Sequence, residues 1–188
     1  MIFEALSFLS EEINEYFRNK LRIKEDKVVL SGIVDARGEI AIDGSNKIIV
    51  TLINIEKETT QTTVLGQHAA NTAASPLQLN LYVMFSAYFN RGNYGESLRF
   101  ISFILAYFQH KNVFNSQNSP GLDERIDKLI FELQVLSQDQ LNNIWASLGA
   151  KYMPCVVYKV RMLNIDESIV REYRPEITTI ENNSSLKS

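Results

Sequence analysis

Few residues in this chain have the types and spacing that catalysis requires. The 188 residues include one cysteine, Cys155, and two histidines, His68 and His110. A cysteine nucleophile needs a histidine beside it as a base, and these three residues stand in unrelated sequence contexts. Cys155 follows Pro154 in an apolar segment, so we interpret it as a small hydrophobic core residue. We expect His110 to end a helix, where a cation favours the dipole, and His68 to lie in a solvated loop.

Glu56 and Glu58 are the carboxylates whose spacing suits acid–base or metal chemistry. They stand two residues apart at the end of an expected strand, so they share one of its faces. The simpler interpretation is a solvated strand end. The alternative is a hydrolase or ligand-binding domain that gathers Glu56, Glu58 and His68 around a pocket. Because the sequence contains no glycine-rich phosphate-binding motif and no Gly-x-Ser-x-Gly, we predict no catalytic residue, no cofactor and no metal.

Composition narrows the class of protein further. The 19 basic and 22 acidic residues give a formal charge of -3, and no basic block offers the phosphate contacts of a nucleic-acid-binding protein. Apolar residues make up 45% of the chain, enough for a core. A single cysteine excludes an internal disulfide and fits a reducing compartment, so we expect cytoplasmic synthesis and assembly. The sequence shows neither a signal peptide nor about 18 consecutive apolar residues, so we predict no membrane span.

Three segments have helical periodicity. From Ile2 to Leu21, apolar residues recur every three or four positions. A second helix is expected from Asn93 through Gln109, with Asn93 and Glu96 forming a capping box; its apolar run covers nearly every side, so it needs burial on several sides. The third begins at Ser137, capped with Gln140, and ends at Gly149, the residue of a left-handed C-cap. We expect Trp145 to face the core from this helix.

The other apolar segments favour strands. The expected ranges are 27–34, 39–43, 47–55, 77–85, 127–136 and 154–163. Tight turns are expected to join the first three, with Asp43-Gly44 as the hairpin turn. In the last strand, Lys159 and Arg161 share a face that we expect to meet solvent or a partner.

These elements predict an α+β fold, with a mostly antiparallel sheet of about four to six strands packed with three helices. Residues 1–165 form a single domain in this interpretation, and 166–188 a C-terminal extension that is flexible or ordered by a neighbour. The polar segment 59–75 is longer than most structureless loops. It is either a plain linker or a functional loop.

Three separated blocks resemble one family in the same order: Val50 to Glu58, Pro76 to Ser86, and Leu141 to Pro154 running into Val157 to Arg161. The family is the cap, or tube-terminator, protein of extracellular contractile injection systems of the antifeeding-prophage and Photorhabdus virulence cassette type. The resemblance covers roughly residues 2 to 165. It implies a phage tail-terminator-like fold, a hexameric ring at the particle end away from the baseplate, and no enzymatic activity.

The partners that this resemblance implies are the inner tube protein, the sheath protein and further copies of the chain. The particle would then be released or associated with a membrane. We predict that segment 59–75 and the residues from Glu172 onward contact tube or sheath. The alternative within the same class is another phage-tail component, at the start of the tube or on the baseplate side. The predicted interface residues are Gln61, His68, Asn71, Lys159, Arg161, Tyr173 and Arg174.

Overall fold

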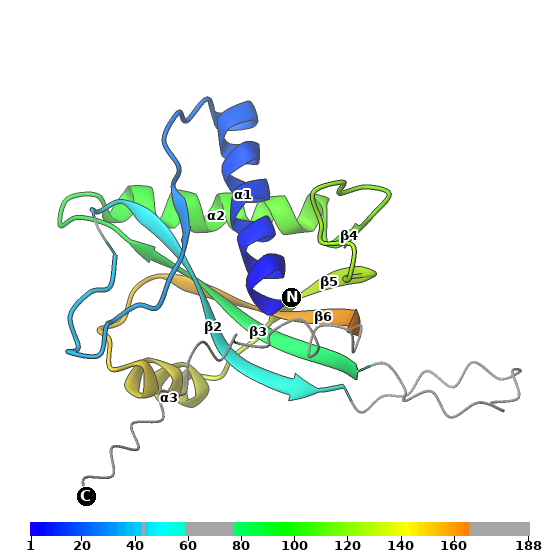
Figure 1. Ribbon diagram of the computed structural model, residues 1–188. Coiled ribbons are helices and arrows are strands. Elements are labelled where there is room, and N and C mark those ends of the chain that lie inside the picture. The colour runs from blue at the N-terminus through cyan, green and yellow to red at the C-terminus, as the bar shows by residue number, and fades with distance from the viewer. Residues whose placement is uncertain (43, 59–76, 166–188) are drawn as a thin grey trace, which may run out of the picture.

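The computed structural model describes residues 1–42, 44–58 and 77–165 (Figure 1). Its three helices are α1 (Ile2–Leu21), α2 (Tyr94–His110) and α3 (Gln138–Leu148). The described strands belong to one six-stranded sheet, and the α+β class is as predicted. No described helix has the length and apolar character needed to cross a membrane. The strands are β1 (Val28–Leu30), β2 (Lys47–Lys57), β3 (Leu77–Tyr88), β4 (Val113–Asn115), β5 (Lys128–Gln134) and β6 (Cys155–Ile165).

The sheet has the strand order β1-β2-β3-β6-β5-β4. All neighbouring strands pair antiparallel except β1 and β2, which run parallel. The predicted mostly antiparallel sheet is therefore confirmed. The long strands β3 and β6 lie at its centre, with Ser86 opposite Cys155.

Helices cover the sheet on both sides: α1 and α2 pack on one face and α3 on the other (Figure 1). The alternation expected along β3 holds, because Leu81, Val83 and Phe85 enter the core beneath α1 and α2. Met84 points the other way and packs with Trp145 of α3. Trp145 is only 5% exposed, so its predicted core position is confirmed.

Asn14 fastens α1 to the edge of the sheet. Its Oδ1 accepts hydrogen bonds from the backbone N–H groups of Lys27 and Val28, both at 2.9 Å. Its Nδ2 donates to the Val28 carbonyl oxygen at 2.8 Å. One buried amide thus satisfies three backbone groups at the start of β1.

The ends of α3 are those that the sequence predicts. Ser137 Oγ accepts from the Gln140 N–H at 3.2 Å, and the Ser137 N–H donates to Gln140 Oε1 at 2.9 Å. Gly149 closes the helix with φ 65°, a left-handed conformation that glycine adopts without steric cost.

The predicted hairpin at Asp43-Gly44 is wrong. β1 pairs directly with β2 in parallel, so no strand lies between them to form a hairpin with β2. Residues 39–42 form no strand; Ile40 makes only an isolated antiparallel bridge with Val34. The strand expected over 27–34 is reduced to β1. Residue 43 lies outside the described residues.

The capping box predicted at the start of α2 is also wrong. Asn93 makes no side-chain cap; its Nδ2 donates instead to Asn46 Oδ1 at 3.2 Å. Glu96 pairs with Arg99. A contact with a residue distant in sequence has replaced the local cap.

Two further findings concern α2 and the segment after it. One side of α2 is open in the described chain, with Leu98 44% exposed, so the burial expected inside the domain or against a neighbouring copy is only partly supplied within it. The short strand β4 is a finding of the structure that the sequence analysis did not predict. Three residues are too few to show an alternating pattern.

Candidate protein-binding surfaces

One end of the sheet brings together segments that are far apart in sequence. β3 ends there, while β2 and β6 begin there: Lys47 pairs with Tyr88, and the Ala87 N–H donates to the Pro154 carbonyl oxygen at 2.8 Å. The connection from α3 to β6 therefore passes beside the turn that leads from β3 into α2. These two connections form two walls of a groove.

Asn46 fixes the turn between β3 and α2. It has φ 60°, a left-handed conformation that asparagine tolerates better than most residues. From that position its Oδ1 accepts from the Asn90 backbone N–H at 3.1 Å and from Asn93 Nδ2 at 3.2 Å. The turn that carries Arg91 is thereby held against the start of β2.

A third wall comes from the turn between Val34 and Ile40, in the connection from β1 to β2. Asp35 Oδ1 accepts from the backbone N–H groups of Arg37 and Glu39 at 2.8 and 3.0 Å. These hydrogen bonds to the charged form hold the pKa of Asp35 below its usual value. The carboxylate stabilises a tight turn at the rim.

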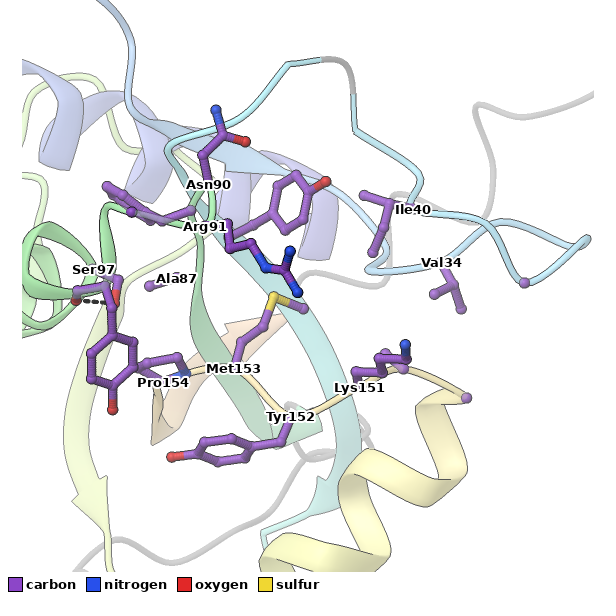
Figure 2. A pocket seen from close by; sticks show the side chains of 17 residues that line it. Val34, Ile40, Ala87, Asn90, Arg91, Ser97, Lys151, Tyr152, Met153 and Pro154 are labelled. Carbon is purple, nitrogen blue, oxygen red and sulfur yellow. Dashed lines mark hydrogen bonds between the residues drawn. The ribbon is translucent and has the colours of Figure 1, made fainter.

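The three walls enclose a groove of about 820 Å³. Figure 2 shows Arg91 extending over the groove from the β3–α2 turn. Lys151, Tyr152 and Met153 lie on the wall formed by the α3–β6 connection, and Val34 and Ile40 lie on the third wall. Among the described residues that line the groove, none is acidic. They are Val34, Gly38, Ile40, Ala87, Tyr88, Phe89, Asn90, Arg91, Gly92, Tyr94, Ser97, Gly149, Ala150, Lys151, Tyr152, Met153 and Pro154.

A polar network crosses the other half of the sheet, on the α3 side. Glu56 Oε2 accepts from the Tyr82 hydroxyl at 2.8 Å, and this hydrogen bond raises the pKa of Tyr82. Glu58 accepts from Asn80 Nδ2 at 3.0 Å. The two glutamates thus join β2 to β3.

The cationic face predicted on β6 belongs to this network. Lys159 Nζ lies 3.9 Å from Glu58, and Arg161 pairs with Glu132 of β5. The two cations are therefore partly buried members of ion pairs across four strands. Arg161 Nε is buried without a hydrogen-bond partner in the described chain.

Of the hydrolase site considered above, the structure describes Glu56 and Glu58, and these two do not line a common hollow. Glu56 lines a hollow of about 490 Å³ beside α3, together with Tyr82 and Gln140, but Glu58 is not among its lining residues. His68 lies outside the described residues. Of the predicted interface residues, only Lys159 and Arg161 are described; Gln61, His68, Asn71, Tyr173 and Arg174 fall in the segments that are not.

Cys155 stands where β6 begins and is half-buried, which is less than the core position expected. Burial raises the pKa of its thiol, so the neutral form is favoured, as for an unreactive cysteine.

The sequence analysis missed the groove altogether. Its lining residues are scattered over 34–40, 87–97 and 149–154, and no periodic pattern connects them. The one signal in the sequence was the stretch from Tyr88 to Tyr94, which holds Tyr88, Arg91 and Tyr94, since Tyr and Arg are enriched at protein interfaces.

A family comparison assigns the chain. The model of the Pvc16 N-terminal domain matches residues 5–179. The chain belongs to the Pvc16 N-terminal domain family. The resemblance drawn from the three sequence blocks is thereby confirmed. No curated protein gives a significant match.

Two solved structures share the fold of this Pvc16 N-terminal domain. One is the PVC sheath/tube terminator of an extracellular contractile injection system in its extended state, with a TM-score of 0.54, 11% identity and 100% of this chain covered. The other is the tube-terminating cap of the anti-feeding prophage, with a TM-score of 0.51, 14% identity and 96% covered. The matches cover 64% and 60% of those chains, so the present chain spans less than two thirds of their length.

Proposed function

We propose that this protein is a structural cap that ends the inner tube and sheath of a contractile, phage-tail-like injection particle. The observation that carries the proposal is the similarity of fold to a sheath/tube terminator and to a tube-terminating cap, in matches that cover 100% and 96% of this chain. Membership of the Pvc16 N-terminal domain family supports it. The proposed role is non-enzymatic, and we propose that assembly takes place in the cytoplasm.

Such a cap needs one surface that fits the last ring of the tube and no equivalent surface for another layer. Polymerisation then stops, because a heterologous contact propagates only when each added layer repeats the surface it binds. We propose that the partners are the inner tube protein, the sheath protein and further copies of the chain in a hexameric ring. The groove at the end of the sheet and the exposed side of α2 are surfaces suited to such contacts.

Lys159 and Arg161 remain proposed interface residues, together with Gln61, His68, Asn71, Tyr173 and Arg174. Because the two cations are paired with Glu58 and Glu132, we propose that they present ordered ion pairs to the partner. Segment 59–75 and the residues from Glu172 onward are proposed to contact tube or sheath. Deleting each in turn and measuring binding to purified particles tests this, and unchanged binding after both deletions refutes it.

The location of the protein tests the cap function itself. A producing strain carrying a gold-labelled tag on this chain is imaged by negative-stain electron microscopy. Label at one end only, opposite the baseplate, is the expected result. Label along the shaft, or at the baseplate, would instead identify a tube or sheath subunit or an initiation component.

The hydrolase alternative has a separate test. Glu56→Gln removes a carboxylate that it invokes and that the proposed interface does not include. A hydrolase would lose its activity after this change, whereas a cap would keep its location at the particle end. Loss of the terminal label in a folded Glu56→Gln variant would contradict the interface as we propose it.

A further inference from the structure

The groove at the end of the sheet carries positive charge that nothing in the described part of the chain neutralises. Arg91 and Lys151 line it, and neither forms an ion pair with a described residue. Asp35 and Glu39, which stand in the turn beside the groove, both pair with Arg37 at 3.1 and 3.7 Å. The groove therefore favours an occupant that brings carboxylates.

Its aromatic residues indicate that the occupant is a protein surface. Tyr94 and Tyr152 line the groove with 64% and 63% of their surface exposed. Tyrosine and arginine are the residues enriched at the centres of protein–protein contacts, where a ring supplies apolar area and a polar tip at low entropic cost. Covering rings that are this exposed buries a large apolar area, which favours binding of a partner.

The chain itself carries a complementary surface, the outer face of α1. Glu11 and Glu15 are exposed, stand one helical turn apart and form no ion pair with a described residue. They differ in this from Glu12, whose carboxylate pairs with Lys111 at 3.0 Å. Phe3, at the start of the same helix, is 69% exposed. The outer face of α1 thus offers two carboxylates that form no ion pair with a described residue.

We propose that the groove of one copy binds the outer face of α1 of a second copy, with Arg91 and Lys151 against Glu11 and Glu15. The α3–β6 connection that forms part of the groove and α1 lie on opposite sides of the sheet (Figure 1). The contact therefore joins two unlike surfaces, and such a head-to-tail contact closes into a ring or continues as a filament. This inference rests on the proposed function, because a closed ring is the form that a cap requires.

Charge reversal tests the contact on the full chain. Two variants are prepared, Arg91→Glu with Lys151→Glu, and Glu11→Lys with Glu15→Lys. Like charges then face each other in each variant, so self-association, measured by sedimentation and native mass spectrometry, is expected to weaken roughly tenfold or more. A wild-type chain that stays monomeric at the highest concentration reached overturns the proposal.

Mixing the two variants distinguishes this contact from loss of folding. In an equal mixture, an acidic groove meets a basic helix and a basic groove meets an acidic helix, so both contacts are attractive again. The expected result is association of the mixture into alternating assemblies, with neither variant associating alone. If the mixture stays dissociated, the groove and the α1 face are not partners, and the proposal fails.

A matched control separates the contact from net charge. Lys24→Glu with Lys57→Glu lowers the formal charge by the same amount as the groove variant, at two exposed positions outside both surfaces. This control is expected to associate as the wild type does; equal weakening would overturn the specific contact. Reversed groove charges that abolish particle binding but leave self-association intact would assign the groove to a different protein.

The outcome of the charge-reversal experiment is independent of the labelling experiment that tests the cap function. Failure of the charge-reversal experiment, with label still at the particle end, removes the proposed contact and leaves the cap. Restored association in the mixture, with label elsewhere on the particle, removes the cap and leaves the contact.

Discussion

Asn46 Oδ1 lies 3.1 Å from the backbone nitrogen of Asn90 and accepts its hydrogen bond. The two residues are 44 positions apart, one just before β2 and the other just after β3. The same oxygen accepts from Asn93. A single side chain in a left-handed conformation thus holds the turn that presents Arg91 to the groove.

Replacing Asn46 by alanine is expected to destabilise the protein by about 1–2 kcal/mol. The change removes an acceptor from two donors, and alanine tolerates the left-handed conformation of residue 46 less well than asparagine does. Chemical denaturation measures the loss, and amide exchange at Asn90 is expected to become faster. Asn46→Asp keeps the acceptor and tolerates the left-handed conformation, so equal losses in the two variants would contradict the assigned role.

Asn14→Ala is expected to cost about 2–4 kcal/mol, because it leaves the N–H groups of Lys27 and Val28 and the Val28 carbonyl without their partner. The matched control is Asn19→Ala, the same substitution at an exposed position of α1. Both changes share the gain in helix propensity, so the difference between their unfolding free energies isolates the buried amide. Similar values for the two would show that α1 is not fastened in this way.

Ser137→Ala removes the cap of α3 and is expected to destabilise the protein by about 1 kcal/mol. Its hydroxyl accepts from the Gln140 N–H, which would be left to water. Ser147→Ala, on the exposed side of the same helix, serves as the control and is expected to be neutral or slightly stabilising. The comparison is made by thermal and urea unfolding of both variants.

Asp123 should make stability depend on pH in the acid range. Hydrogen bonds from Arg125, at 2.7 and 2.9 Å, lower the pKa of this carboxyl from 3.8 to about 2. A lowered folded-state pKa means that the contribution is present above pH 3.8 and is lost as the pH falls through about 2. Asp123→Asn should therefore be less stable than the wild type near neutral pH, and the two unfolding curves should converge at about pH 2. A difference that is constant with pH would exclude this carboxylate as its source.

Local patterns were enough to predict the elements whose determinants are local. The spacing of apolar residues located α1, the capping residues Ser137 and Gln140 with Gly149 located α3, and strict alternation located β3. A helix periodicity, a cap and an alternating strand each depend on residues a few positions apart. The three sequence blocks from Val50 to Arg161 were sufficient to predict the family.

The direction of β1 and the start of α2 depended on contacts that no local pattern contains. The sequence of 27–55 reads equally well as consecutive hairpins, and only the parallel pairing of β1 with β2, supported by Asn14 from α1, selects the observed path. Likewise, Asn93 has the composition of a cap, but its amide bonds to Asn46. In both cases a contact with a residue distant in sequence formed in place of the expected local contact.

The sequence by itself determined the three helices, the long strands β2, β3, β5 and β6, and the family that the chain resembles. The tertiary structure alone decided that Arg91, Lys151 and Tyr152 share one groove with no acidic residue among its described lining, and that Lys159 and Arg161 are paired with Glu58 and Glu132. The reason is physical: burial patterns repeat along a chain and can be read from it, whereas a surface is made where the ends of different strands meet. Its composition is set by the order of strands in the sheet, which short-range spacing does not encode.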